Sequence, residues 1–222
     1  MIKFACLSPH PPILLPNVGS SLDKEKLSGT IEALKTLRKK IEKVSPQIII
    51  ISSPHPEWGL EVPLYFLKPN QDYLERPTQE ANKVNLEINQ KENLIYPILT
   101  TLDSPQEHFD WGKQLSQQLP DGETIALIAS GDMSHRLKKE GPYGFHPNGP
   151  EFDRQLINLL KQGKTRAILD LDKNLAENAG ECGWRSLCLV LGVIEGQKIK
   201  LDPQIFSYQK PFGVGYLVAS LI

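Results

Sequence analysis

Four consecutive isoleucines, Ile48–Ile51, constrain the fold of this chain more than any other feature. Isoleucine is branched at its β-carbon, which favours extended backbone over helix. A strand in which every residue is apolar must be buried on both faces, and this is typical of the centre of a parallel sheet. Pro46-Gln47 directly precedes the run and marks where the strand begins. The run therefore predicts a central strand of an α/β sheet.

The residues before this run complete a strand–helix–strand unit. Ile2–Leu7 is an apolar stretch that predicts a buried first strand. Asp23–Lys43 predicts a helix, because apolar side chains recur there at steps of three and four residues. Two parallel strands need a crossover of this kind, so the N-terminal part of the chain predicts a βαβ unit.

The rest of the chain continues the alternation of strands and helices. We expect strands at Val62–Leu67, Leu94–Leu99 and Thr124–Ala129, and a closing antiparallel hairpin of Ile199–Tyr208 and Gly215–Ile222. Helices are expected at Gln79–Glu92, Pro105–Leu119, Phe152–Gln162, Arg166–Asp170 and Trp184–Ile194. The prediction is a single α/β domain over residues 1–222, with a mixed, mostly parallel central sheet and helices on both faces.

The composition argues against several classes of protein. A formal net charge of −1 provides no strong field for nucleic acid or an anionic membrane, and no apolar run approaches the roughly 20 residues that span a bilayer. Three cysteines, Cys6, Cys182 and Cys188, are too few for a disulfide framework. The first residues match a strand rather than a signal peptide, so we expect a cytoplasmic protein. A homo-oligomer is left open.

Three of the five histidines directly follow predicted strands. His10 lies in Ser-Pro-His-Pro, His55 lies in a second Ser-Pro-His-Pro, and His135 follows the turn-forming stretch Ser130-Gly131-Asp132. Ligands bind at the carboxyl edge of parallel strands, and neighbouring strands would bring the three loops together there. The prolines on both sides of His10 and His55 stiffen the backbone, which suits a preorganised ligand. The pattern predicts a metal site at the carboxyl ends of the strands.

A carboxylate would complete such a site, since two histidines and one carboxylate with open positions suit Fe(II) oxygen chemistry. Glu181, in Gly180-Glu181-Cys182-Gly183, is the best candidate. Its flexible neighbour at a predicted helix start would let it approach an ion closely. Cys182 is a softer alternative, but a single cysteine without a partner at ligand spacing is a weak signal.

Each of these residues also has a purely structural explanation. A histidine after a strand is more often a loop or capping residue, and Asp132 could belong to simple turn chemistry. Glu181 could merely stabilise a helix N-terminus. His108 lies in polar surroundings and is expected to face solvent.

Six short motifs occur in order between Pro9 and Tyr216: P-H-P-P-I-L, S-P-H, S-G-D-M-S-H-R-L, G-P-E-F-D, A-G-E-C-G-W-R-S and G-V-G-Y. Together they resemble the catalytic subunit of class III extradiol ring-cleavage dioxygenases, most closely the branch found in AmmeMemoRadiSam system protein A. The resemblance implies that His10, His55 and Glu181 are the metal ligands and that His135 is the acid/base beside them. It implies a non-haem Fe(II) enzyme that opens a catecholic ring with O2, with Zn(II) as the alternative metal.

One departure from the family pattern bears on activity. Related sequences carry D-H-G before V-P-L-Y-F-L, and its histidine lies near the oxygen-binding position, whereas Glu57-Trp58-Gly59 stands near that place here. Two other functions are therefore weighed: a Zn(II)-dependent hydrolase-like enzyme, and a non-catalytic module that binds a metal or a partner. The identity of the bound metal and the turnover of catechols would separate the three.

Overall fold

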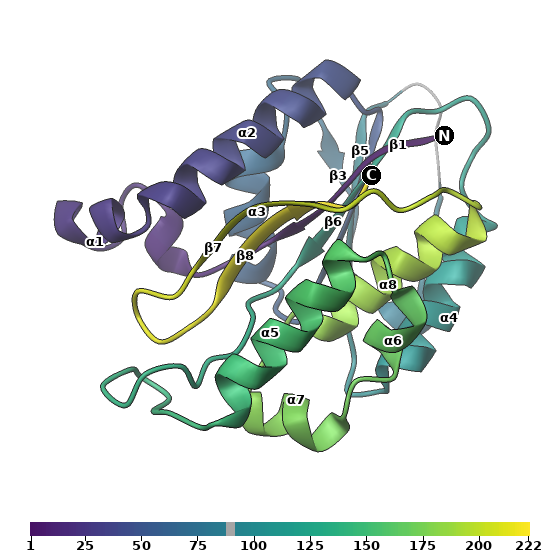
Figure 1. Cartoon of the computed structure of the whole chain (residues 1–222). Helices are drawn as coiled ribbons and strands as arrows, with labels where there is room; N and C mark the ends of the chain where they lie inside the picture. Colours follow the sequence, from purple (N-terminus) through teal and green to yellow (C-terminus); the bar gives the residue numbers. More distant parts are fainter. Residues whose placement is uncertain (88–91) are drawn as a thin grey trace.

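In the computed structural model, which describes residues 1–87 and 92–222, the strands form one mixed sheet (Figure 1). The strands are β1 (Ile2–Ser8), β2 (Ile48–Ser53), β3 (Leu74–Glu75), β4 (Gln79–Glu80), β5 (Leu94–Leu99), β6 (Ile125–Ser130), β7 (Gln204–Gln209) and β8 (Tyr216–Ser220). Their order is β3-β5-β2-β6-β1-β8-β7, with β4 also paired to β5. The pairs among β5, β2, β6 and β1 are parallel, whereas β8 runs antiparallel to both β1 and β7. The predicted fold class is confirmed.

Helices cover both faces of this sheet (Figure 1). They are α1 (Ser21–Lys26), α2 (Ser28–Val44), α3 (Trp58–Leu67), α4 (Pro105–Ser116), α5 (Asn148–Lys161), α6 (Thr165–Leu169), α7 (Lys173–Ala179) and α8 (Trp184–Gly196), with short 3-10 helices at Pro12–Leu14 and Ala81–Lys83. Alternate isoleucines of β2 enter two separate cores: Ile49 and Ile51 pack with side chains of α2 and α3, and Ile48 and Ile50 with side chains of α4 and α8. The isoleucine run is thus buried on both faces, as its composition predicts.

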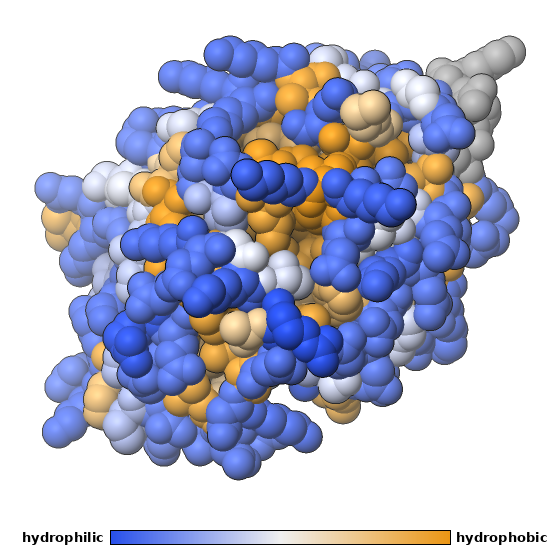
Figure 2. Space-filling view, turned by 45° about the vertical axis from the view of Figure 1, so that its right-hand side comes forward, coloured by the Kyte–Doolittle hydropathy of each residue, from blue (hydrophilic) through white to orange (hydrophobic). Residues whose placement is uncertain are grey.

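The space-filling view shows how hydrophilic and apolar residues are distributed on one face of the molecule (Figure 2). Hydrophilic side chains stand outward, and the apolar side chains lie mostly in the recesses between them. Among the described residues, no helix has both the length and the apolar character needed to cross a bilayer.

The strand predicted at Val62–Leu67 is wrong, because these residues belong to α3. Val62 and Phe66 are buried while Glu61 and Tyr65 are exposed, which is a helical spacing of four. The apolar stretch alone is too short to distinguish the two periods. Pro63 also fits a helix badly, because it lacks the N–H that would donate to the Gly59 carbonyl.

The helix predicted at Gln79–Glu92 is wrong over its described part. The structure has strand β4 and a 3-10 helix there, and the Gln79 side chain exchanges hydrogen bonds with the Asn85 backbone in place of helical bonds. Residues 88–91 lie outside the described residues.

Two other helices differ from the prediction. The one predicted at Asp23–Lys43 is divided at the buried Leu27, which ends the short α1 and directly precedes α2. A capping box of Ser20 and Asp23 begins α1. Helix α7 was not predicted, although Asp172 caps its first turn and Gly180 ends it in the left-handed conformation. This helix delivers the chain to the Glu181–Cys182 segment.

Candidate metal centre

The loops that follow β1, β2 and β6 meet at one edge of the sheet. Strand β6 lies between β1 and β2, so the loops after all three are neighbours, as the sequence predicts. They bring His10, His55 and His135 to the wall of one cavity with a volume of about 590 Å³. The three histidines are therefore brought together by the sheet order.

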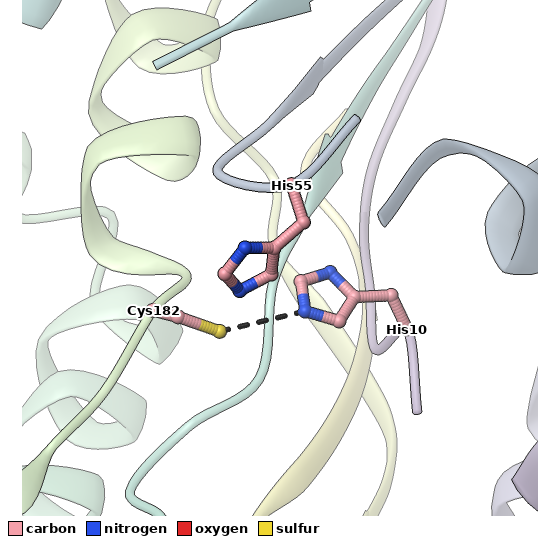
Figure 3. A group of neighbouring side chains, drawn as sticks. All are labelled: His10, His55 and Cys182. Carbon is pink, nitrogen blue, oxygen red and sulfur yellow. Dashed lines mark hydrogen bonds between the residues drawn. The ribbon is translucent and has the colours of Figure 1, made fainter. Parts of the chain in front are cut away.

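A thiol forms a group of three donors with two of these histidines. The ligand atoms of His10, His55 and Cys182 all lie within 4.8 Å of one another, and the three side chains point toward a common centre (Figure 3). The Cys182 Sγ is 3.5 Å from the Nε2 of His10. Two imidazoles and a thiolate fit a first-row transition metal such as Fe(II) or Zn(II).

His10 is oriented by a chain of hydrogen bonds that begins at a proline. Pro63 has no N–H, so the Gly59 carbonyl four residues earlier lacks its helical partner and accepts the Ser130 hydroxyl instead. Since Ser130 donates to Gly59, its oxygen is left to accept the Nδ1–H of His10 at 2.9 Å. The Nε2 of His10 then carries the lone pair and faces Cys182, which is the tautomer a metal ligand needs.

The buried position of His10 keeps its ring neutral. Burial and, to a smaller extent, the nearby His55 ring lower the pKa of His10 to about 3. A neutral imidazole is the form that binds a metal ion. Burial raises the pKa of the Cys182 thiol. A cation bound to the sulfur would lower this pKa and favour the thiolate.

Asp132 holds the loops of the group together. Its carboxylate accepts the backbone N–H of His10 at 3.0 Å, and its carbonyl accepts the N–H groups of Cys182 and Gly183. Its own N–H donates to the Cys182 Sγ at 3.3 Å. Burial raises the pKa of Asp132 to about 6. Asp132 therefore does more than form a turn. It joins the loop of His10, its own loop after β6 and the segment of Cys182.

Two glycines let the Cys182 segment approach β6. A Cβ on Gly131 would lie 2.1 Å from the Cα of Gly183, so a side chain at this point would displace backbone. Gly183 therefore serves the packing of the Cys182 segment on the loop after β6.

Glu181 lies outside the group of three donors. Its carboxylate accepts the Trp184 N–H at 2.7 Å at the start of α8, and the side chain lines a separate cavity of about 350 Å³ beside Arg185. Burial raises the pKa of Glu181 to about 7. Adjacent residues at this helix start point in different directions, and in this conformation Cys182 faces the two histidines.

His135 reaches the same cavity without joining the group. Its Nε2 is 3.7 Å from the Cys182 Sγ, and its ring stacks on Tyr143 with a centroid distance of 5.0 Å and an angle of 29° between the planes. The backbone N–H of His135 donates to the Ala179 carbonyl at the end of α7. Burial lowers the pKa of His135. The ring is placed beside the donors and kept neutral.

His108 does not face solvent, which corrects the expectation from its polar surroundings. Its side chain is fully buried at the start of α4, where Nδ1–H donates to the Ser104 carbonyl and Nε2 accepts the Thr101 N–H. Both ring nitrogens are therefore satisfied by backbone. This histidine has a structural role away from the cavity.

Comparisons with known proteins bear on the family and the fold of this chain. A family model described as the catalytic LigB subunit of aromatic ring-opening dioxygenase matches residues 55–219. Protein CA_C1420 of Clostridium acetobutylicum is 30% identical over 97% of this chain, which covers 56% of that protein. The chain thus spans little more than half the length of this relative. The crystal structure of uncharacterized protein JW3007 from Escherichia coli K12 shares the fold, with a TM-score of 0.54 at 14% identity and coverage of 99% of both chains.

Proposed function

Because the chain belongs to the family of the catalytic LigB subunit of aromatic ring-opening dioxygenases, we propose that it is an Fe(II)-dependent enzyme that opens the ring of a catecholic substrate with O2. The single observation that carries this proposal is the cavity lined by His10, His55 and His135, with the Cys182 thiol against the rings of His10 and His135. Its volume of about 590 Å³ falls in the range of small-molecule sites. The family match was expected from the order of the six motifs.

The ion in this proposal is held by His10 and His55, with Cys182 as the third ligand. Support comes from the short distances among these three donors and from the tautomer of His10. Glu181, which the sequence and the resemblance favour as third ligand, remains a prediction. Its carboxylate would have to leave the Trp184 N–H before it could face the two imidazoles.

The chemistry that a bound Fe(II) supplies is Lewis acidity toward the diol oxygens and electrons for O2. His135 is proposed to accept a diol proton at Nε2, because it lines the cavity and burial lowers its pKa, which favours the neutral ring. Stacking on Tyr143 holds the plane of that ring. Asp132 keeps the His10 backbone and the Cys182 loop in register during the reaction.

The activity is tested with protein purified without oxygen and loaded with Fe(II). Catechols should then be consumed together with O2, and labelled dioxygen should place both oxygen atoms in the product. Trp58 begins α3 near the position where related sequences carry the D-H-G histidine. We therefore expect turnover to be slow. Binding of catechols without any O2 uptake would contradict the proposed activity and leave only common ancestry with the family.

The ligand set is tested by metal content after loading each variant. His10→Ala and His55→Ala should abolish tight binding in either set, because each removes a donor. Cys182→Ser should lose the metal if the proposed set is correct, whereas Glu181→Gln should keep it. The reverse result would establish the Glu181 set, and full metal content in both variants would remove both residues from the coordination of the ion.

A thiolate among the donors favours a second candidate, since Cys and His ligands suit Zn(II) as well as Fe(II). Zn(II) in the same position would lower the pKa of bound water and support hydrolysis. The metal found after purification from the native host distinguishes the two. Zn(II) in the native protein, with hydrolysis of a simple ester that His135→Ala abolishes, would favour the hydrolase.

A further inference from the structure

Apart from the histidines, the charged side chains that line the cavity are all acidic. Glu57 and Asp132 line it, and none of its lining residues in the described part of the chain is a lysine or an arginine. A carboxylated ligand would therefore find no cation on the wall to pair with. An anion taken out of water without a partner is disfavoured.

The two carboxylates differ in what they can reach. Asp132 is 6% exposed and already accepts the N–H of His10, so it belongs to the framework of the loops. Glu57 is exposed at the start of α3, and no hydrogen bond or ion pair of its carboxylate is found within the described residues. Glu57 also lines the neighbouring cavity. Of the two carboxylates, Glu57 is therefore the one left to meet a substituent on a bound ring.

Flat apolar surfaces make up much of the remaining wall. Trp58 is 52% exposed and Tyr143 is 58% exposed, which is unusual for large aromatic side chains, and both line this cavity. They come from different segments, Trp58 from the start of α3 and Tyr143 from the loop after β6. Aromatic faces bind planar rings, and they also attract cations.

We propose that this cavity selects catechols with a neutral or amine-bearing substituent and rejects those with a carboxylate. The inference rests on the proposed function, because it assumes that the diol is held near His10 and His55. Glu57 is the residue that determines the charge preference. Trp58 contributes affinity for the ring regardless of the substituent.

Binding, rather than turnover, tests the selection. Three catechols, dopamine, methylcatechol and protocatechuate, are titrated calorimetrically into Fe(II)-loaded protein without oxygen. Dopamine and methylcatechol should bind at least about tenfold more tightly than protocatechuate, since an unpaired carboxylate is opposed by Glu57. Equal or tighter binding of protocatechuate would overturn the inference while leaving the proposed function intact.

Variants on α3 assign the preference to one side chain. Glu57→Gln should reduce the ratio of dopamine to protocatechuate affinity by about three- to tenfold and leave methylcatechol binding unchanged. Glu61→Gln is the matched control, because Glu61 lies one turn later and lines the neighbouring cavity alone, whereas Glu57 lines both cavities. An unchanged ratio in Glu57→Gln, or an equal change in Glu61→Gln, would contradict the role of Glu57.

The aromatic contribution has its own matched pair. Trp58→Ala should weaken binding of all three catechols to a similar extent, by about threefold or more. Tyr65→Ala removes an equally exposed aromatic side chain of α3 that lines the other cavity, and it should have no effect. If none of the catechols binds more tightly to the Fe(II)-loaded protein than to the metal-free protein, the proposed function fails and this inference fails with it.

Discussion

His135 differs from the other two cavity histidines in what its side chain contacts. His10 and His55 face the Cys182 thiol within the group of donors, whereas His135 lies at its edge and stacks on Tyr143. A ligand and a base need different environments, because a base must stay free to take a proton. The arrangement favours a catalytic role for His135 and a binding role for the other two.

Replacement of His135 should therefore separate rate from metal content. We expect His135→Ala to keep its metal and to lose about 100- to 10,000-fold in turnover of the best catechol, the usual cost of removing a general acid or base. Metal content and initial rate are measured on the same preparation. His146→Ala, at a histidine outside the cavity, is the control and should retain both. Parallel loss of metal in His135→Ala and His10→Ala would instead indicate a three-histidine site.

Among the structural elements, the close approach of the β6 loop to the start of α8 positions the thiol. Gly131 and Gly183 pack backbone against backbone, and the Asp132 carbonyl accepts two N–H groups from the opposite segment. Neither segment contributes to a regular element at this point. The position of Cys182 therefore depends on a contact between loops that glycine alone permits.

Gly131→Ala should move these two segments apart. Its Cβ would lie 2.1 Å from the Gly183 Cα, and backbone cannot yield as a flexible side chain does. We expect a loss of about 1 to 3 kcal/mol in unfolding free energy and weaker metal binding. Urea unfolding and metal titration measure the two effects.

Gly29→Ala provides the control for this substitution. Gly29 lies in α2, and a Cβ there would meet only the end of the Gln209 side chain. Alanine also favours the helix. This variant should bind metal normally, and an unchanged metal affinity in Gly131→Ala would show that the glycine contact does not position Cys182.

At the scale of the whole molecule, a buried carboxyl group links folding to pH. Asp153 is 1% exposed and accepts the Ser134 N–H and the Tyr208 hydroxyl, which connects α5, the His135 loop and β7. Burial raises the pKa of Asp153 to about 6 from an ordinary value of 3.8. The folded state therefore holds this proton to higher pH than the unfolded chain does, and folding is weakened as pH rises through that range.

The contribution of Asp153 is isolated by comparison with Asp153→Asn. The unfolding free energy of the wild type should fall relative to that of the variant by up to about 3 kcal/mol between about pH 4 and pH 7. Tyr208→Phe removes a hydrogen bond that lowers this pKa, so the range should move to higher pH. Urea unfolding of metal-free protein at a series of pH values gives both results. A constant difference between wild type and Asp153→Asn would contradict the assignment.

Much of the architecture could be predicted from local pattern. The isoleucine run, the strand at Leu94–Leu99 and the start of α8 at Trp184 are all found where the sequence predicts them. Each has a long or fully apolar pattern that few other structures satisfy. The prediction is wrong at Val62–Leu67, where the apolar pattern is short. It is also wrong over the described part of Gln79–Glu92, where the Gln79 side chain bonds the Asn85 backbone.

The sequence by itself predicted that the loops of His10, His55 and His135 meet, because the carboxyl ends of neighbouring parallel strands lie at one edge of the sheet. It also identified the family, since six motifs occur in order. Only the tertiary structure decided which neighbour of the pair Glu181 and Cys182 faces His10 and His55 in this conformation. The physical reason is that direction at a helix start depends on long-range contacts. Here these contacts are the packing of Gly183 on Gly131 and the hydrogen bond from the Trp184 N–H to the Glu181 carboxylate. Neither contact can be recognised from the spacing of residues in the sequence.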